Sequence, residues 1–144
     1  MNIGFLGLGK LGLPVSLAVE DKGHNIFGYD ISKQTIEDIK NRKIRYREEW
    51  VDKYLPKTKL QINSIGNLVK NSEIIFVPIQ TPHDPQYEGI TRIPKKRIDF
   101  DYSYLKSGIK ELSQEIEKNG EDKVVIIIST VLPGTIRTQI KPLL

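Results

Sequence analysis

Short apolar runs alternate along the chain with stretches long enough to form helices. The runs are bounded by glycine, proline or polar residues, as is typical of buried strands. They predict strands at 2–6, 25–29, 59–62, 73–77 and 123–129. The intervening stretches predict helices at 11–22, 32–40, 64–69 and 101–118, with a helical turn or two at 49–55. Ser32 is the expected N-cap of the second of these helices.

The order of these elements indicates the fold class. Strands separated by helices of this length pair in parallel through right-handed crossovers. Continuous apolar runs, rather than alternating ones, indicate strands that are covered on both faces. We therefore predict an α/β protein with a Rossmann-type doubly wound parallel sheet, three α/β/α layers and the strand order 3-2-1-4-5. The length of 144 residues fits a single domain, which we expect to span 1–144.

Composition excludes several classes of protein. Hydrophobic residues make up 38% and charged residues 28% of the chain, an ordinary globular balance. The sequence contains no apolar run of membrane-spanning length and no basic leader, so we expect a cytoplasmic protein with no membrane partner. Cysteine is absent, which excludes disulfides and thiolate metal ligands. No spacing of acidic residues and histidines suggests a metal site.

The formal charge of +4 is unevenly distributed. Residues 40–59 carry eight basic side chains against three acidic ones, and a second basic cluster lies at 92–97. Such patches can meet a phosphate-bearing ligand, but a solvated surface is the favoured interpretation. We expect no nucleic-acid partner.

The sequence Gly7-Leu8-Gly9-Lys10-Leu11-Gly12 is a GxGxxG motif placed directly between the first strand and the first helix. A dinucleotide pyrophosphate needs backbone N–H donors at a helix N-terminus and no side chain in the way. The first glycine allows the tight turn, and the second allows the phosphates to approach the backbone. The third allows the helix to pack closely on the strand. The alternative is a glycine turn that serves packing alone.

Asp30 closes the second strand, 18 residues after Gly12. A carboxylate there accepts hydrogen bonds from the adenosine ribose and repels a 2′-phosphate, which favours NAD over NADP. The alternative is an aspartate that only caps the next helix. Lys33 lies close enough in sequence to reach the ribose or a phosphate, although an exposed lysine is the favoured interpretation. Dinucleotide binding is the function that these features predict together.

Two later strands end in hydroxyl-bearing turns. The fourth leads into Thr81-Pro82, and the fifth into Ser129-Thr130. Ligands of open α/β sheets bind at the carboxyl ends of the strands, where a hydroxyl can contact a ribose or hold a water molecule. These threonines can equally cap the turns that follow them.

Taken together, the glycine motif with Leu13-Pro14 after it, Tyr29-Asp30, Thr81-Pro82 and the block 129–135 resemble the UDP-glucose/GDP-mannose dehydrogenase family, in its N-terminal NAD-binding domain. Members oxidise a nucleotide-sugar alcohol to the acid in two NAD-dependent steps, within polysaccharide precursor biosynthesis. The resemblance implies that Thr81 and Thr130 contact the cofactor and that Thr130 also positions a catalytic water. The full expected cofactor set is Gly7, Leu8, Gly9, Lys10, Leu11, Gly12, Asp30, Lys33, Thr81 and Thr130.

The chain also departs from the family pattern. Thr35 stands where the family has a lysine, and the loop 83–100 is longer than the family's. The family's catalytic lysine, asparagine and cysteine lie beyond this length, so the resemblance implies a fragment without the central helix and the substrate domain, which is inactive alone. A homo-oligomer is the expected assembly. The alternatives are a free-standing dinucleotide-binding module without turnover and the cofactor domain of a hydroxyacid dehydrogenase of the 6-phosphogluconate type.

Overall fold

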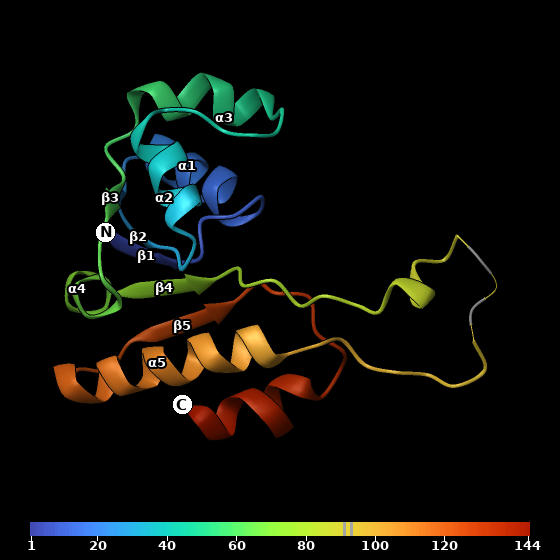
Figure 1. The fold of residues 1–144 in the computed structure, drawn as a ribbon. Coiled ribbons are helices and arrows are strands. Elements are labelled where there is room, and N and C mark those ends of the chain that lie inside the picture. Colours follow the sequence, from blue (N-terminus) through green and yellow to red (C-terminus); the bar gives the residue numbers. More distant parts are fainter. Residues whose placement is uncertain (91, 93) are drawn as a thin grey trace.

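The structure is a computed structural model that describes residues 1–90, 92 and 94–144. Its centre is a five-stranded, all-parallel sheet with the order β3-β2-β1-β4-β5 (Figure 1). The strands are β1 Asn2–Leu6, β2 Asn25–Tyr29, β3 Gln61–Ile62, β4 Ile74–Val77 and β5 Val124–Ile127. The predicted fold class, strand order and approximate strand positions are confirmed.

Helices cover both faces of the sheet (Figure 1). On one face lie α1 Gly12–Asp21, α2 Lys33–Lys40 and α3 Glu49–Tyr54, the last followed by a 3-10 turn at Leu55–Lys57. On the other face lie α4 Ile65–Asn71, α5 Ser103–Asn119 and the C-terminal turns Ile136–Ile140 and Lys141–Leu143. This arrangement confirms the three α/β/α layers.

Each face of the sheet has its own hydrophobic core. Side chains of a strand alternate between faces, so Phe5 packs toward α1, α2 and α3 while Leu6 packs toward α4 and α5. Phe5 is fully buried and stacks on Phe76 of the neighbouring strand at 5.2 Å between ring centroids. Burying one such side chain contributes about 1.5–3 kcal/mol to folding. The sheet is therefore held from both sides, and its carboxyl edge is a fixed platform.

Helix ends follow the signals in the sequence. The Ser32 hydroxyl accepts the Thr35 amide at 3.2 Å, and the Ser64 hydroxyl accepts the Asn67 amide at 3.3 Å. Both serines satisfy amide groups that the first helical turn leaves free. Ser32 thus places the start of α2 directly after Asp30.

Strand β3 is shorter than the predicted 59–62. The Lys59 amide donates to Oε1 of Glu20 in α1 at 2.6 Å, and the Leu60 amide donates to the Thr58 hydroxyl at 3.0 Å. The Thr58 hydroxyl in turn donates to Glu20. Because these side chains accept hydrogen bonds from the Lys59 and Leu60 amides, those amides do not pair with β2. The hydrogen-bonded strand therefore begins only at Gln61.

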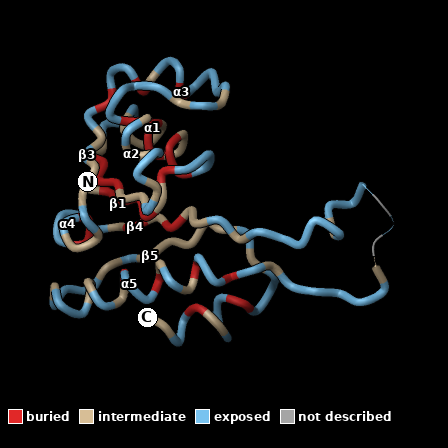
Figure 2. Tube along the Cα trace, viewed as in Figure 1, coloured by how far each residue is buried: buried red, intermediate tan, exposed pale blue. Residues whose placement is uncertain are grey.

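Between β4 and α5, the described residues 82–90, 92 and 94–101 form a long arm that projects away from the rest of the molecule (Figure 1). Its described residues are mostly exposed (Figure 2), including the basic residues Arg92, Lys95, Lys96 and Arg97. The Asp101 amide donates to the Pro82 carbonyl at 2.8 Å, and the Tyr87 hydroxyl donates to the Lys96 carbonyl at 2.6 Å. These two bonds join the outgoing and the returning segments of the arm. Of the helices in the described ranges, none has the length and apolar character needed to cross a membrane.

Candidate functional site

A cavity of about 800 Å³ lies at the carboxyl edge of the sheet. Its walls come from the ends of β1, β2, β4 and β5 and from one face of α5. Both its size and its position are typical of a small-molecule site in an open α/β sheet. The predicted site residues that line it are Gly7, Gly9, Lys10, Leu11, Asp30, Thr81 and Thr130.

The three motif glycines meet different requirements. Gly7 has a φ of +121°, a conformation that favours glycine, and its amide donates to the Tyr29 carbonyl at 2.8 Å. A Cβ on Gly12 would lie 2.1 Å from the Gly7 carbonyl oxygen. A Cβ on Gly9 would meet no heavy atom of the described residues within 4 Å. The backbone conformation thus requires glycine at position 7 and packing requires it at position 12, whereas the space beside Gly9 is open to the cavity.

The N-terminus of α1 faces this open space. Leu11 occupies its N-cap position, and in the described part of the chain no side chain caps the helix there. The Leu13 amide already donates to the Gly9 carbonyl at 3.0 Å, and Pro14 has no N–H. Among the first three residues of α1, the Gly12 amide is therefore the donor that has no partner in the described residues, and the helix dipole adds positive potential. This combination suits an anionic group such as a pyrophosphate.

Asp30 is fixed in place by two backbone donors. Its Oδ2 accepts the Leu8 amide at 2.7 Å, and its Oδ1 accepts the Ser32 amide at 2.8 Å. Each carboxylate oxygen keeps a further lone pair for an outside donor. The half-buried carboxylate lines the cavity beside the glycine motif, a position from which it can accept hydrogen bonds from a ribose.

Leu8 and Lys33 lie outside the described lining of the cavity. Leu8 is only 1% exposed and packs in the core under the loop, so its contribution to the site is the amide that holds Asp30. Lys33 is exposed at the first position of α2, where Ser32 and Thr35 line the cavity instead. Lys10 does line the cavity, with its ammonium 6.0 Å from the centre of the Tyr46 ring.

The two predicted threonines meet at the other end of the cavity. The Thr81 hydroxyl donates to the Thr130 carbonyl at 2.7 Å, and beside it the Ser129 hydroxyl donates to the Val77 carbonyl at 3.1 Å. These bonds tie the turn after β4 to the turn after β5. The Thr130 side chain is exposed, so its hydroxyl is accessible to a ligand or a water molecule.

Several cavity residues were not predicted. Tyr104, Ser107, Gly108 and Glu111 all come from α5 and line the cavity together. Their spacing of i, i+3, i+4 and i+7 places them on one helix face, but a face that carries Ser107 and Glu111 has the pattern of a solvated surface, so the sequence gives no signal that it borders a cavity. Burial raises the pKa of Tyr29, and the charges of Glu111 and Asp30 raise it further. Tyr29 therefore stays a neutral phenol between two carboxylates. The described residues contain no cluster suited to a metal ion.

Curated relatives of the chain are sugar-nucleotide dehydrogenases. The chain is 29% identical over 139 residues to UDP-N-acetyl-D-mannosamine dehydrogenase of Pyrococcus horikoshii, a match that covers 94% of this chain and 30% of that protein. It is 27% identical over 149 aligned positions to GDP-mannose 6-dehydrogenase of Pseudomonas aeruginosa, covering all of this chain and 32% of that protein. The chain thus spans about a third of the length of these relatives.

The fold is similar to that of solved dehydrogenases. A ternary complex of GDP-mannose dehydrogenase from Pseudomonas aeruginosa superposes with a TM-score of 0.82 at 25% identity, covering 99% of this chain and 31% of that one. The family model for the NAD binding domain of UDP-glucose/GDP-mannose dehydrogenases matches residues 1–144. The sequence left open whether the chain belongs to this family or is the cofactor domain of a hydroxyacid dehydrogenase. The match selects this family. The chain belongs to the UDP-glucose/GDP-mannose dehydrogenase family, of which it is the NAD binding domain.

Proposed function

We propose that residues 1–144 form a single domain that holds NAD in the cavity at the carboxyl edge of the sheet. Asp30 accepts the hydroxyls of the adenosine ribose. The backbone from Gly9 to the start of α1 accommodates the pyrophosphate. Thr81 and Thr130 lie at the nicotinamide end. The open space beside Gly9, the uncapped helix and the remaining lone pairs of Asp30 all support this assignment.

The whole protein, in this proposal, oxidises the alcohol of a UDP- or GDP-linked sugar to the acid, with NAD as the hydride acceptor. Its product serves polysaccharide precursor biosynthesis in the cytoplasm, and the enzyme acts as a homo-oligomer. The relatives support this substrate class, because their names pair UDP- or GDP-sugars with dehydrogenase activity.

The 144-residue chain by itself binds NAD without turning a sugar over. Oxidation of an alcohol needs a group that accepts its proton and a pocket that holds the reacting carbon near the nicotinamide. At its threonine end the cavity offers hydroxyls, and the sequence contains no cysteine to form a covalent intermediate. Thr130 has an exposed hydroxyl that can position a water molecule, which is the role we assign to it.

The observation that carries the proposal is the position of Asp30. Two backbone amides hold its carboxylate at the cavity wall beside the glycine motif. A fixed negative charge there attracts ribose hydroxyls and repels the 2′-phosphate of NADP.

Calorimetric titration of the chain with NAD and NADP tests this assignment. NAD should bind about tenfold or more tightly than NADP, and Asp30→Asn should weaken NAD binding and reduce the preference to about threefold or less. Asp122→Asn removes a charge at an exposed position outside the cavity and should change neither affinity. Equal binding of the two dinucleotides by the unaltered chain would contradict the role of Asp30.

The absence of turnover is tested with the same protein. Mixed with NAD and either UDP-glucose or GDP-mannose, the chain should produce no NADH, measured by absorbance. Steady NADH formation that disappears in Thr130→Ala would show that this chain carries the complete chemistry, contrary to the proposal.

A further inference from the structure

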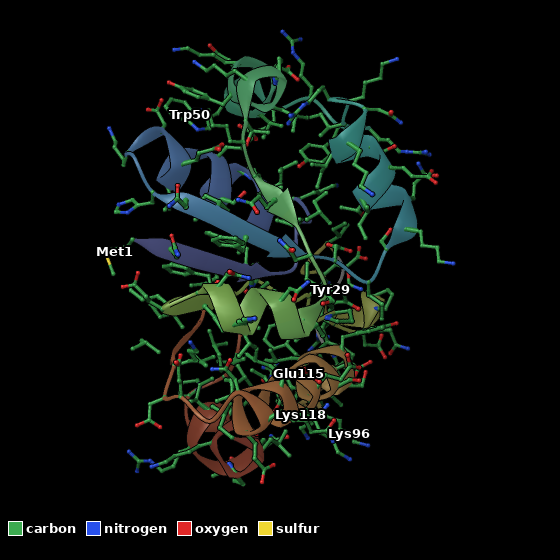
Figure 3. All side chains as sticks on the ribbon, turned by 90° about the vertical axis from the view of Figure 1, so that its left-hand side faces the viewer. Met1, Tyr29, Trp50, Lys96, Glu115 and Lys118 are labelled. Atoms are coloured by element: carbon green, nitrogen blue, oxygen red, sulfur yellow. The ribbon has the colours of Figure 1, made fainter. Side chains whose placement is uncertain are left out.

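The cavity extends past Asp30 into a slot that the glycine motif and the threonines do not account for. This slot lies between the loop after β2 and α5, and it is lined by Ile31, Ile65, Tyr104, Ser107, Gly108 and Glu111. Tyr29, at the carboxyl end of β2, packs toward the same side as α4 and α5 (Figure 3). The inference drawn below rests on the proposed function, because it concerns the group attached to the ribose that Asp30 is proposed to hold.

Two side chains that line the slot are large, apolar and exposed. Ile31 is 84% exposed and Tyr104 is 54% exposed, although both are large hydrophobic side chains. They come from separate elements, the loop after β2 and the first turn of α5, and both line the same cavity. A planar apolar group placed between them would remove both from water, and an aromatic ring such as Tyr104 stacks well on a base.

The slot contains the carboxylate of Glu111. An ionised carboxylate accepts hydrogen bonds and donates none, so Glu111 selects a ligand edge that carries a donor. The ion pairs between described residues do not include Glu111, whereas Glu115, one turn later, pairs with Lys118 at 2.5 Å. The Glu111 carboxylate therefore remains available to a ligand.

Glu111 also lies at the correct end of the cavity. Glu111 and Asp30 line the same cavity, Tyr29 packs against the core cluster that includes α5, and the charges of both carboxylates act on the Tyr29 phenol. A group bonded directly to the ribose at Asp30 would reach the neighbourhood of Glu111. Among purine bases, adenine presents an amine donor at its 6-position, whereas hypoxanthine and guanine present a carbonyl acceptor there, which a carboxylate repels.

We propose that Glu111 is a specificity-determining residue that accepts a hydrogen bond from the exocyclic amine of adenine, with the base held between Ile31 and Tyr104. The slot thus selects an adenine dinucleotide over one that carries a 6-oxopurine.

The test compares NAD with nicotinamide hypoxanthine dinucleotide, which has the same ribose and pyrophosphate but a carbonyl in place of the amine. By calorimetry, the 144-residue chain should bind NAD about tenfold more tightly than the hypoxanthine analogue. Glu111→Gln has an amide that can donate to the carbonyl, and it should reduce the difference to about twofold or less. Glu117→Gln, an exposed position of the same helix outside the cavity, should keep the preference of the unaltered chain.

Each outcome has a distinct meaning. If neither dinucleotide binds, the proposed function itself fails and the role of Glu111 fails with it. If both bind with equal affinity, or if Glu111→Gln keeps the full preference for NAD, dinucleotide binding stands and the role of Glu111 is overturned. Circular dichroism of each variant confirms that a change in affinity is not a loss of fold.

Discussion

The two ends of the cavity are built differently, although both lie at the carboxyl edge of one sheet. At the glycine-motif end, backbone amides donate to the Asp30 carboxylate, and the loop rests on the buried Leu8 side chain. At the threonine end, the turns after β4 and β5 are joined by hydroxyl groups that donate to carbonyl oxygens. The first end is fixed by charge-assisted bonds and packing, the second by weaker neutral bonds near solvent.

This difference separates two tasks. A rigid, preformed end can hold the invariant part of a ligand with little loss of entropy on binding. The threonine end is joined to the projecting arm through Pro82, and its bonds are exposed. It can adjust to whatever group lies beside it. The comparison predicts that substitutions at the glycine-motif end cost more stability than substitutions at the threonine end.

The largest effect should come from Gly12→Ala. Its Cβ would lie 2.1 Å from the Gly7 carbonyl oxygen and 2.8 Å from a side-chain carbon of Pro78, so the loop backbone must shift. We expect a loss of about 3 kcal/mol or more in the free energy of unfolding, measured by urea denaturation. Gly9→Ala is the matched control, because its Cβ meets open space. It should keep stability within about 1 kcal/mol yet weaken NAD binding at least about tenfold. Equal destabilisation by the two variants would contradict the division between packing and ligand space.

Asp30→Ala should have the next largest effect on stability. It removes the acceptors of the Leu8 and Ser32 amides, and bonds to a charged group contribute about 1.5–3 kcal/mol each. Because the carboxylate is only half-buried and water can replace it, we expect a total loss of about 2 kcal/mol. Thermal denaturation followed by circular dichroism measures it. An unchanged melting temperature would mean that the loop does not depend on these bonds.

Thr81→Val should cost less. It deletes one of the two hydroxyls that join the ends of β4 and β5, and the exposed neutral bond that this hydroxyl makes is worth about 1 kcal/mol or less. Thr81→Ser keeps the hydroxyl and should match the unaltered chain in urea denaturation. A loss as large as that of Asp30→Ala would show that the threonine end is as rigid as the other.

The smallest effect concerns the two lysines near the cavity. Lys10→Ala should weaken NAD binding a few-fold and reduce its dependence on salt, because Lys10 belongs to the glycine motif and lines the cavity. Lys33→Ala should leave both unchanged, because Lys33 is exposed outside the lining. Calorimetry at two salt concentrations measures the difference. A larger effect at Lys33 would place the phosphates nearer to α2 than proposed.

The sequence predicted those parts of the fold that depend on local pattern. Strands β1 and β2 have the predicted bounds, and Ser32 caps its helix as expected. Strand β3 came out shorter because Glu20, which is 39 residues away from Lys59 in sequence, accepts its amide. A side chain from a distant helix competes with the ladder, and no local propensity contains that information.

The sequence also predicted one part of the site and missed another. Gly7, Gly9, Lys10 and Leu11 of the glycine motif line the cavity together with Asp30, because their order along a β-α-β segment places them together. The face of α5 was missed, since a helix face with Ser107 and Glu111 has the pattern of a solvated surface. Only the tertiary structure shows that this face borders the slot beside Tyr29.

The shortness of β3 also affects which edge of the sheet can pair with another chain. An edge strand with free amide groups can template pairing with another chain. Here Glu20 and Thr58 occupy the Lys59 and Leu60 amides, and the remaining edge is two residues long. The opposite edge, β5, has four consecutive apolar residues, with Val124 56% exposed. The β5 edge therefore offers a longer stretch of backbone to an added strand than the β3 edge does.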